Sequence, residues 1–574
     1  MFIRVKSSPN SPRQSVQIVQ SLRDGARVKQ NILRHVGVAD DRIELSRLKE
    51  LAGVIIEQMK QQQESHCLFL PEQLPPDRPT TAAGKASARP DTLMVDLLKL
   101  RELQRSIRGI HEIYGQVYRE LGFDNVIGRP SIHGSAMRLL KQMVMARLAC
   151  PGSKRQSVRD LNDRFAIRLS LPAVYRMMDH VDARVIERIN ELAHTSASGL
   201  LGGKINLVFY DCTTLYFESF QEDQDKAQEV QEVPGDQGDR QVQAQGLRSK
   251  GFSKENRFNQ TQVVLALAVS SEGLPLGYEL FPGKTFEGHT FKTFLERVET
   301  RWRPTELVVV ADSAMLNKDN IALLEQKKYG YIVGARLKSL NRTTAAEVQR
   351  HGPEASLREL PLSPASKLVV SYDPVRARKD AHEREKAIAR LKKKLARSSS
   401  PKGMLSGKGT GRFLKLEGQC QVQLNEPAVA EASVWDGLHG VVTNLMTMEG
   451  QAVREQYHGL WQVEACFRVS KHDLRFRPIF HWTAPRIRAH VGICFMALCC
   501  VRTLMYRVKL QQGPMSAEAI RRALLSVQVS ELEHLEDGQR YELPGRPLAE
   551  AEKLYKAMGL KLRTTARRLE VGIG

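Results

Sequence analysis

Two short apolar segments that each end in an aspartate place the strongest constraint on how this chain folds. The first covers residues 205–211 (INLVFYD) and the second covers residues 306–312 (ELVVVAD). Each contains at least four consecutive apolar residues, which is typical of a buried strand. An acid directly after such a strand lies at the carboxyl edge of a sheet, where open α/β sheets hold their functional sites. We therefore expect Asp211 and Asp312 to lie near each other at one edge of a sheet.

The segments around these two strands alternate between strand and helix patterns. A strand, a turn at Glu272–Gly273 and a second strand are predicted within residues 261–283. The other predicted elements are helices at 287–302, 317–329, 453–473 and 484–506, and strands at 330–337 and 439–445. Three strands followed by alternating helix and strand indicate a mixed α/β sheet.

The charge of the chain indicates a polyanionic partner. The 574 residues carry a formal net charge of +22, and 42% of them are hydrophobic, which is enough for several domains with their own cores. Nucleic acid is the first candidate partner and an anionic membrane surface is the second. The longest apolar run, near residues 491–501, has about half of the length that spans a bilayer. We therefore expect a soluble, cytoplasmic protein that binds duplex DNA and no membrane.

Shifts in composition divide the chain into seven predicted segments. The stretch at 61–91 is rich in Gln, Pro, Ala and Ser, which is typical of a linker. A second stretch contains a strongly basic helix at 376–397. A Gln-rich acidic segment at 221–245 is predicted to be a surface loop. The predicted segments are an N-terminal mixed α/β region (1–60), a linker (61–91), a helical DNA-binding region (92–200), the first part of a catalytic core (201–344), an insertion subdomain (345–436), the second part of the core (437–506) and a helical C-terminal tail (507–574).

Residues 157–181, within the helical region, have the pattern of two helices joined by a short turn. Ser157 and Ser170 are the predicted N-caps, and Pro172 falls in the first turn of the second helix, where proline is tolerated. With Arg176 facing outward, the pair fits a DNA-binding helix-turn-helix. An ordinary helical hairpin fits the same pattern equally well.

A third acid, Glu464, lies in the segment YHGLWQVEACFRVSK, Tyr457 to Lys471. In a single helix, Tyr457, Leu460, Glu464, Arg468 and Lys471 recur at offsets 0, 3, 7, 11 and 14, which places them on one stripe. A carboxylate beside an aromatic and two basic side chains suits a metal ligand next to DNA phosphates. A solvated helix with an i,i+4 pair between Glu464 and Arg468 explains the pattern as well.

Three carboxylates from separate elements are the donors that a two-metal phosphoryl-transfer site needs. Mg²⁺ prefers oxygen ligands, and two such ions about 3.5–4 Å apart stabilise both oxygens of an in-line displacement. Asp211, Asp312 and Glu464 are therefore the candidate catalytic residues and the candidate ligands of two Mg²⁺ ions, with Mn²⁺ as an alternative metal.

Three positions of the Glu464 segment also match a known signature. Tyr457, Glu464 and Lys471 fit the pattern Y-x2-R-x3-E-x6-K, so the chain resembles a large group of bacterial insertion-sequence transposases of the DDE type. The resemblance to one branch of that group extends in patches over nearly the whole chain, in segments 15–37, 281–291 and 477–498.

The resemblance implies an RNase H-like catalytic core with three metal-binding acids. Asp211 then follows the first core strand, Asp312 follows the fourth, and Glu464 lies on a later helix. An insertion between the second and third acids is typical of the group, which agrees with the segment 345–436. The implied fold is an α/β, RNase H-like mixed sheet with an inserted subdomain, preceded by a mainly helical DNA-binding region.

The resemblance also implies contacts with transposon-end DNA. Tyr457 and Lys471 take this role by their positions in the signature. Leu460 occupies the position of the signature's arginine. Arg468, one helical turn beyond Glu464, is the candidate for the phosphate contact that this arginine would make.

The predicted function is therefore a transposase that binds the terminal inverted repeats of an insertion sequence. It would cleave DNA strands with divalent metal ions and transfer the freed 3′ ends, as a homodimer on paired ends. Two alternatives are an RNase H-like nuclease without strand transfer and a DNA-binding regulator whose catalytic core has decayed. A third is a membrane-surface protein that uses the basic helix at 376–397.

Overall fold

The computed structural model of the chain forms two compact units. The first comprises Met1–Thr92, Ala335–Leu360 and Leu368–Gly440, and the second comprises Leu93–Gly334, Pro361–Lys367 and Val441–Gly574. The predicted linker at 61–91 and most of the predicted loop at 221–245 lie outside the described residues. The described residues are 2–7, 14–24, 27–39, 45–46, 48–49, 52–53, 56, 95–203, 205–223, 246–252, 259–350, 357–397, 405, 409–417 and 421–569.

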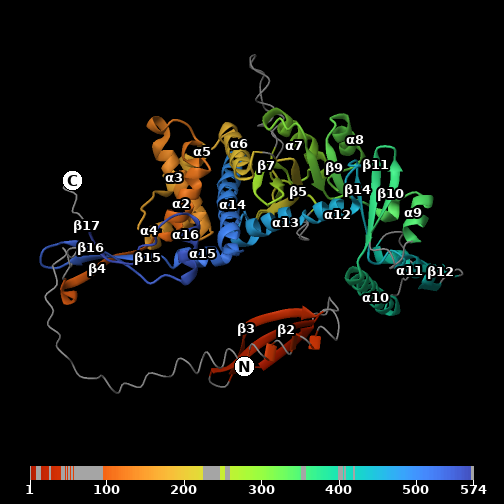
Figure 1. Cartoon of the computed structure of the whole chain (residues 1–574), viewed down its shortest axis with the longest axis horizontal. Helices are drawn as coiled ribbons and strands as arrows, with labels where there is room; N and C mark the ends of the chain where they lie inside the picture. The colour runs from red at the N-terminus through yellow and green to blue at the C-terminus, as the bar shows by residue number, and fades with distance from the viewer. Residues whose placement is uncertain are drawn as a thin grey trace, which may run out of the picture. The chain divides into compact units, whose positions relative to one another are not determined.

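A mixed sheet forms the centre of the second unit (Figure 1). Within this unit, the strands of the sheet lie in the order β14-β9-β8-β5-β6-β7. β5, β6 and β7 are antiparallel neighbours, β8 and β9 run parallel to β5, and β14 is antiparallel to β9. The predicted mixed α/β sheet is thus confirmed. The strands are β5 (Leu207–Tyr216), β6 (Gln262–Ser270), β7 (Pro275–Pro282), β8 (Val308–Ala311), β9 (Gly330–Gly334) and β14 (Leu438–Thr443).

β5 is longer than the sequence predicted. It continues through Tyr216, so Asp211 lies inside the strand, and its predicted place after the strand's end is wrong. The residues after Asp211 are Cys, Thr, Thr, Leu and Tyr, which include types that favour strands, and they pair antiparallel with β6 as far as Gln262. β8 does end directly before Asp312, as predicted.

Helices cover both faces of this sheet (Figure 1). α7 (Glu287–Arg301) and α8 (Lys318–Gln326) lie on one face, and α12 (Gly450–His458) and α13 (Trp461–Arg468) lie on the other. α14 (Ala484–Gln512) is, among the described residues, the one helix long and apolar enough to cross a membrane. Because 83% of its apolar stretch is buried inside the protein, this helix is accounted for as a core helix.

The single helix predicted at 453–473 is wrong, because it is interrupted at residues 459–460, between α12 and α13. Gly459 ends α12, and a Cβ at this position would overlap the ring of Phe209 on β5. A residue without a side chain therefore lets the chain approach the sheet closely here. After α13 the chain continues as a π-helical turn, Val469–Asp473.

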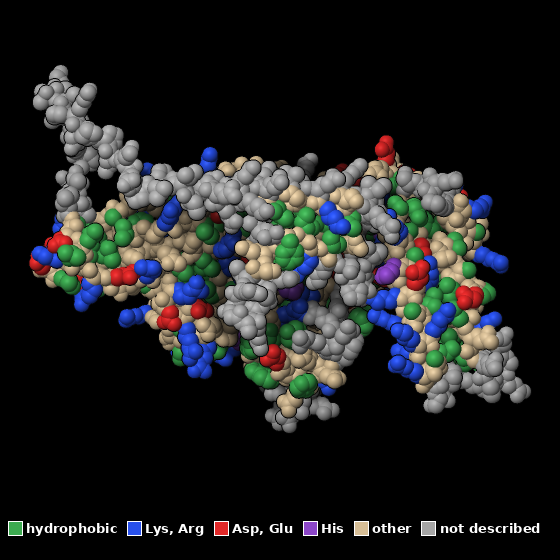
Figure 2. Space-filling model, turned by 90° about the horizontal axis from the view of Figure 1, so that it is seen from below, with side chains coloured by type: hydrophobic (Ala, Val, Ile, Leu, Met, Phe, Trp, Pro, Cys, Tyr) green, Lys and Arg blue, Asp and Glu red, His purple; other side chains and the backbone are tan. Residues whose placement is uncertain are grey.

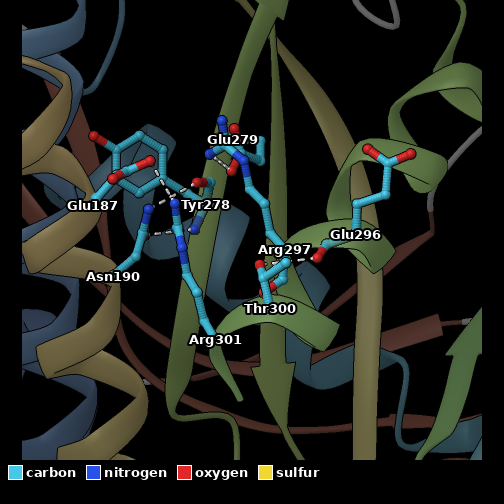
Figure 3. Close-up of polar contacts among 8 residues, drawn as sticks. All are labelled: Glu187, Asn190, Tyr278, Glu279, Glu296, Arg297, Thr300 and Arg301. Atoms are coloured by element: carbon cyan, nitrogen blue, oxygen red, sulfur yellow. Dashed lines mark hydrogen bonds and ion pairs between the residues drawn. The ribbon is translucent and has the colours of Figure 1, made fainter. Parts of the chain in front are cut away.

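α6 (Ala183–Leu200) closes the β7 edge of the sheet through a buried polar contact (Figure 3). The Asn190 side chain accepts a hydrogen bond from the Tyr278 backbone N–H at 3.0 Å and donates one to the Tyr278 carbonyl at 3.3 Å. Arg301 of α7 pairs with Glu187 of α6 at 2.6 Å. The Asn190 amide thus satisfies the backbone groups that an edge strand leaves unpaired.

The predicted pair of helices in the helical region is present. α4 runs from Lys154 to Phe165 and α5 from Leu171 to Asp179, with Pro172 in the first turn of α5 and Arg176 exposed. The N-cap of α4 is Ser153, which accepts from the Gln156 N–H at 3.2 Å, so the predicted Ser157 cap is wrong. The other helices of this region are α2 (Gly115–Glu120), α3 (Pro130–Ala149) and α6 (Ala183–Leu200).

A second, antiparallel sheet joins two segments that the sequence predicted to be helical. Its order is β17-β16-β15-β4, and it pairs Ile107 with Gln528. The pairing partners are more than 400 residues apart in the chain, so local sequence patterns did not reveal them. The elements are β4 (Leu100–Ile107), β15 (Gln528–His534), β16 (Arg540–Pro544) and β17 (Arg567–Leu569), with helices α15 (Ala517–Leu525) and α16 (Ala549–Ala557).

The first unit contains an antiparallel sheet at the N-terminus and a separate set of elements from the middle of the chain. The N-terminal strands are β1 (Phe2–Ser7), β2 (Gln14–Asp24) and β3 (Arg27–Ala39). The others include α9 (Arg342–Gln349), α10 (Pro374–Arg397), β12 (Leu414–Glu417), β13 (Gln421–Leu424) and α11 (Glu426–Ser433). β10 (Leu357–Ser363) and β11 (Ser366–Tyr372) belong in part to each unit.

α10 is the basic helix that the sequence predicted. Its Leu391 is buried in a small cluster with residues of β12 and β13. Arg390, Lys393 and Arg397 are exposed, and at 100° per residue they point about 100° to 160° away from Leu391. Figure 2 shows Lys and Arg side chains gathered over this helix, at the right of the view.

Candidate active site

Asp211 lies within β5, and Asp312 directly follows the neighbouring parallel strand β8. The register of β5 and β8 pairs Phe209 with Val310. If this register is continued for two residues, past the end of β8, Asp211 comes beside Asp312. Neighbouring strands lie about 4.8 Å apart, and residues in register point to the same face. The prediction that these two acids lie near each other at one place on the sheet therefore agrees with the strand register.

The alternation of side chains along β5 decides which face holds the acids. Tyr210 and Cys212 are buried in a cluster with Phe291 of α7, and the Tyr210 hydroxyl donates to the Thr290 hydroxyl at 2.9 Å. Since successive side chains of a strand point to opposite faces, Asp211 points away from α7. α13 packs against β5 and β6, on the face opposite α7 (Figure 1). Asp211 thus faces the helix that carries Glu464.

Asp211 and Glu464 line one open cleft with a volume of about 530 Å³. Asp211 is half-buried and Glu464 is exposed. Arg468, Lys471 and Arg477 also line the cleft, so the two carboxylates lie among three permanently positive side chains. Such a mixture suits a polyanion that is held partly through a cation and partly through direct contacts with basic groups. The remaining lining residues are Cys212, Thr213, Trp461, Ala465, Phe467 and His472.

Asp312 does not line this cleft. Its Oδ1 accepts hydrogen bonds from the backbone N–H groups of Ala314 and Met315, both at 2.9 Å. These bonds close the turn after β8 and hold the carboxyl group in place, while Oδ2 takes no part in them. The Oδ1 atom of Asp211 accepts in the same way from the Cys212 N–H at 2.7 Å. Both aspartates therefore have one oxygen tied to the backbone.

The donor set suits a hard divalent cation in kind. Asp211 lies on β5, Asp312 directly follows β8, and Glu464 lies on α13, which packs against β5. Within the ranges that the structure describes, no three Asp, Glu, His or Cys side chains are close enough to hold a metal ion. Glu464 is exposed on α13, where a side chain changes rotamer without repacking the core.

The residues predicted to contact DNA lie on two helices, α12 and α13, and on the turn that follows. Arg468 and Lys471 line the cleft together with Glu464. Tyr457 lies on α12, which packs against β8 and β9, and a Cβ at Gly334 of β9 would lie 2.5 Å from its phenol oxygen. The continuous helix assumed from Tyr457 to Lys471 is therefore wrong, and Tyr457 does not line the cleft.

Arg477 is a cleft residue that the sequence analysis did not single out. Its guanidinium group lies over the ring of Tyr216, 5.3 Å from the ring centre, and burial lowers its pKa. It reaches the cleft because the chain returns to the end of β5, where the Ile479 N–H donates to the Tyr216 carbonyl at 3.1 Å. The basic residues Arg475 and Arg477 were the only local signal for this, and they did not show where the segment folds.

The matching residues of a known family cover half of the chain. Residues 213–500 match the family described as transposase DDE domain. The chain belongs to this transposase family. The matched part of the transposase begins two residues after Asp211 and includes Asp312, Glu464, Arg468 and Lys471.

No curated protein matches this transposase. Among solved structures it is similar to the cryo-EM structure of the piggyBac transposase synaptic complex with hairpin DNA. The two chains share 10% identical residues at a TM-score of 0.34, over 73% of this chain and 78% of that one. A similarity of this degree carries no argument about individual residues.

Proposed function

We propose that this transposase cleaves DNA strands and transfers their 3′ ends, with Asp211, Asp312 and Glu464 as ligands of divalent metal ions. The observation that carries the proposal is the register of β5 and β8. Continued for two residues, this register would bring Asp211 and Asp312 beside each other, and α13, which carries Glu464, packs against β5. The family match supports the class of reaction.

Each carboxylate has a distinct part in holding this site. The backbone N–H groups of Ala314 and Met315 fix Asp312, and the Cys212 N–H binds Asp211. Glu464 approaches from the opposite wall of the cleft. Two Mg²⁺ ions, or Mn²⁺ ions, would supply charge stabilisation for the attacking and leaving oxygens of an in-line displacement at phosphorus. The protein's own contribution is to position the reacting groups.

The basic wall of the cleft would bind the DNA backbone. Arg468, Lys471 and Arg477 would neutralise phosphates on either side of the scissile bond. Tyr457 would contact DNA outside the cleft, because it lies on α12 and does not line the cleft. The exposed Arg176 on α5 makes the helix pair α4 and α5 the candidate for reading the terminal repeats.

The finer parts of the proposal rest on the signature around Glu464. They are an RNase H-like core interrupted by an insertion at 345–436, the terminal inverted repeats of an insertion sequence as the DNA bound, and a homodimer on paired ends. Duplex DNA is the proposed partner throughout.

Replacing Asp312 by Asn tests the assignment most directly. The Asn side-chain oxygen still accepts the bonds from Ala314 and Met315, so the turn is retained while the negative charge is lost. We expect strand cleavage of a duplex carrying the DNA that flanks the gene, with MgCl₂, to fall at least about 100-fold. Binding of the same duplex in EDTA should be unchanged.

Asp319→Asn is the matched control, since Asp319 is exposed in the first turn of α8. It should cleave at the wild-type rate. Wild-type cleavage by the Asp312→Asn or the Asp312→Ala protein would refute the assignment of Asp312.

A further inference from the structure

Two large aromatic side chains are exposed on the segment that connects the π turn after α13 to α14. Phe480 is 53% exposed and Trp482 is 61% exposed, whereas Ile479 and His481 are buried. This alternation is that of an extended chain, in which every second side chain points to the same side. Phe480 and Trp482 therefore face solvent together, and we call this pair the aromatic platform.

The platform begins where the candidate active site ends. Arg477, three residues before Phe480, lines the cleft with Asp211. Ile479 donates its N–H to the Tyr216 carbonyl at 3.1 Å and forms a bridge with Phe217, so the segment is pinned to the end of β5. A DNA strand that leaves the cleft on the side of Arg477 would meet the platform next.

Further contacts hold the platform rigid. The guanidinium group of Arg248 lies 4.9 Å from the centre of the Trp482 ring. The Asp223 carboxylate holds Arg248 in two ways. It forms an ion pair with the Arg248 guanidinium group at 2.6 Å, and it accepts a hydrogen bond from the Arg248 backbone N–H at 3.0 Å. The buried His481 packs edge-on against Tyr175 of α5, with ring centres 6.3 Å apart. The Trp482 ring and the backbone between the two rings are thus positioned before any partner binds, which reduces the entropy cost of binding.

The spacing and the surroundings of the platform suit a nucleobase. Residues i and i+2 of an extended chain are about 6.7 Å apart, which is twice the rise of about 3.4 Å between stacked bases. One flat base therefore fits between two such rings. Exposed apolar side chains beside a basic cleft favour a partner with both a flat apolar face and a negative backbone, which is a nucleic-acid strand.

We propose that Phe480 and Trp482 bind an unpaired base of the DNA strand that occupies the cleft, with Arg477 at the adjacent phosphate. The proposal deepens the proposed function and rests on it for the identity of the partner as DNA. An unpaired base binds here more readily than a paired one, because the energy of unstacking has already been supplied. The platform would thus favour DNA whose strands are separated next to the scissile bond.

A binding comparison without metal tests the proposal. The probes are a blunt duplex and the same duplex with a short single-stranded extension, whose first unpaired base is 2-aminopurine, both in EDTA. We expect the wild-type protein to bind the extended duplex more tightly and to quench 2-aminopurine fluorescence. The Phe480→Ala/Trp482→Ala protein should lose about 5- to 100-fold in affinity for the extended duplex, the range of one stacking contact. Its binding to the blunt duplex should be unchanged.

Two variants serve as controls. Trp482→Phe keeps an aromatic ring and should retain most of the preference. Phe286→Ala removes an aromatic ring that is 56% exposed at the start of α7, on the other face of the sheet, and should retain all of it. Unchanged binding of the blunt duplex shows that each variant is folded.

Each remaining outcome is decisive. If the double variant prefers the extended duplex as strongly as the wild type, the platform does not bind a base. The same conclusion follows if the double variant alters self-association in sedimentation but not the preference. If the wild-type protein binds neither duplex, DNA is not the partner and the proposed function itself fails.

Discussion

Lys154, at the start of α4, is buried in a cluster of basic side chains. It is 4% exposed, and its Nζ lies 3.3 Å from Nδ1 of His490 on α14. Arg147, His481 and Cys494 are the other titratable groups of this cluster. Burial and the charge of Arg147 lower the pKa of Lys154 to about 7, against an opposing effect of Cys494. Lys154 is therefore largely neutral at slightly alkaline pH.

The hydrogen bonds support a neutral lysine. His490 donates from Nε2 to the Phe476 carbonyl at 3.1 Å, so its Nδ1 is an acceptor, and the Lys154 amine donates to it. Lowering the pKa from 10.5 to about 7 disfavours the folded state by about 5 kcal/mol at pH 7, at about 1.4 kcal/mol for each pH unit.

Replacing Lys154 by Met should therefore stabilise the protein at pH 7. The substitution removes the cost of about 5 kcal/mol but leaves the His490 acceptor unpaired, which costs about 1–3 kcal/mol. We expect a net gain of about 2–4 kcal/mol in the free energy of unfolding at pH 7. Between pH 7 and 10.5 the unfolded state binds the proton and the folded state does not, so wild-type stability rises with pH. The advantage of the variant should accordingly vanish near pH 9.

Urea unfolding at pH 7 and pH 9 measures this difference, with hydrogen exchange of α4 and α14 peptides as the probe. This probe reports the unfolding of only the two helices that hold Lys154 and His490. Arg155→Met, which removes an exposed charge from the next position, should change little at either pH. A variant that is less stable than the wild type at pH 7, or whose advantage is the same at both pH values, would refute the argument.

Two further predictions concern DNA binding by α10 and the glycine between α12 and α13. Replacing Arg390, Lys393 and Arg397 of α10 by Ala should lower the slope of log K against log salt concentration by about 0.9 for each lost phosphate contact. Fluorescence anisotropy of a labelled duplex measures this slope, and an unchanged slope would show that α10 is only a solvated surface. Gly459→Ala places a methyl group against the Phe209 ring and should destabilise the protein by about 1–3 kcal/mol, displacing α13 from β5. Thermal unfolding and Mg²⁺-dependent cleavage should both report the change, while full cleavage activity would mean that α13 tolerates the shift.

Local patterns were sufficient where an element is specified by its own residues. α7 was expected at 287–302 and runs from Glu287 to Arg301, because its apolar spacing already defines a buried face. β8 ends before Asp312 as expected, because the polar residues after it favour a turn. In the same way, the charge of α10 follows directly from its sequence.

Elements that depend on distant partners were not predicted. β4 pairs with β15 at the other end of the chain, and its mixed polar pattern only becomes a strand through that pairing. The close approach of Gly459 to Phe209 joins residues that are 250 positions apart in the chain. Neither contact has a signal within a window of local sequence, because neighbours in space are not neighbours in the chain.

The sequence by itself determined which acids, bases and aromatic residues are available for a site. The tertiary structure decided which of them meet. The parallel pairing of β5 and β8 puts the strand that holds Asp211 next to the strand that Asp312 follows, and the alternation along β5 turns Asp211 toward α13 and Glu464. Tyr457, on α12, lies outside the cleft, and the return of the chain to Tyr216 brings Arg477 in. These placements depend on strand pairing and close packing between segments far apart in the chain, which local periodicity does not encode.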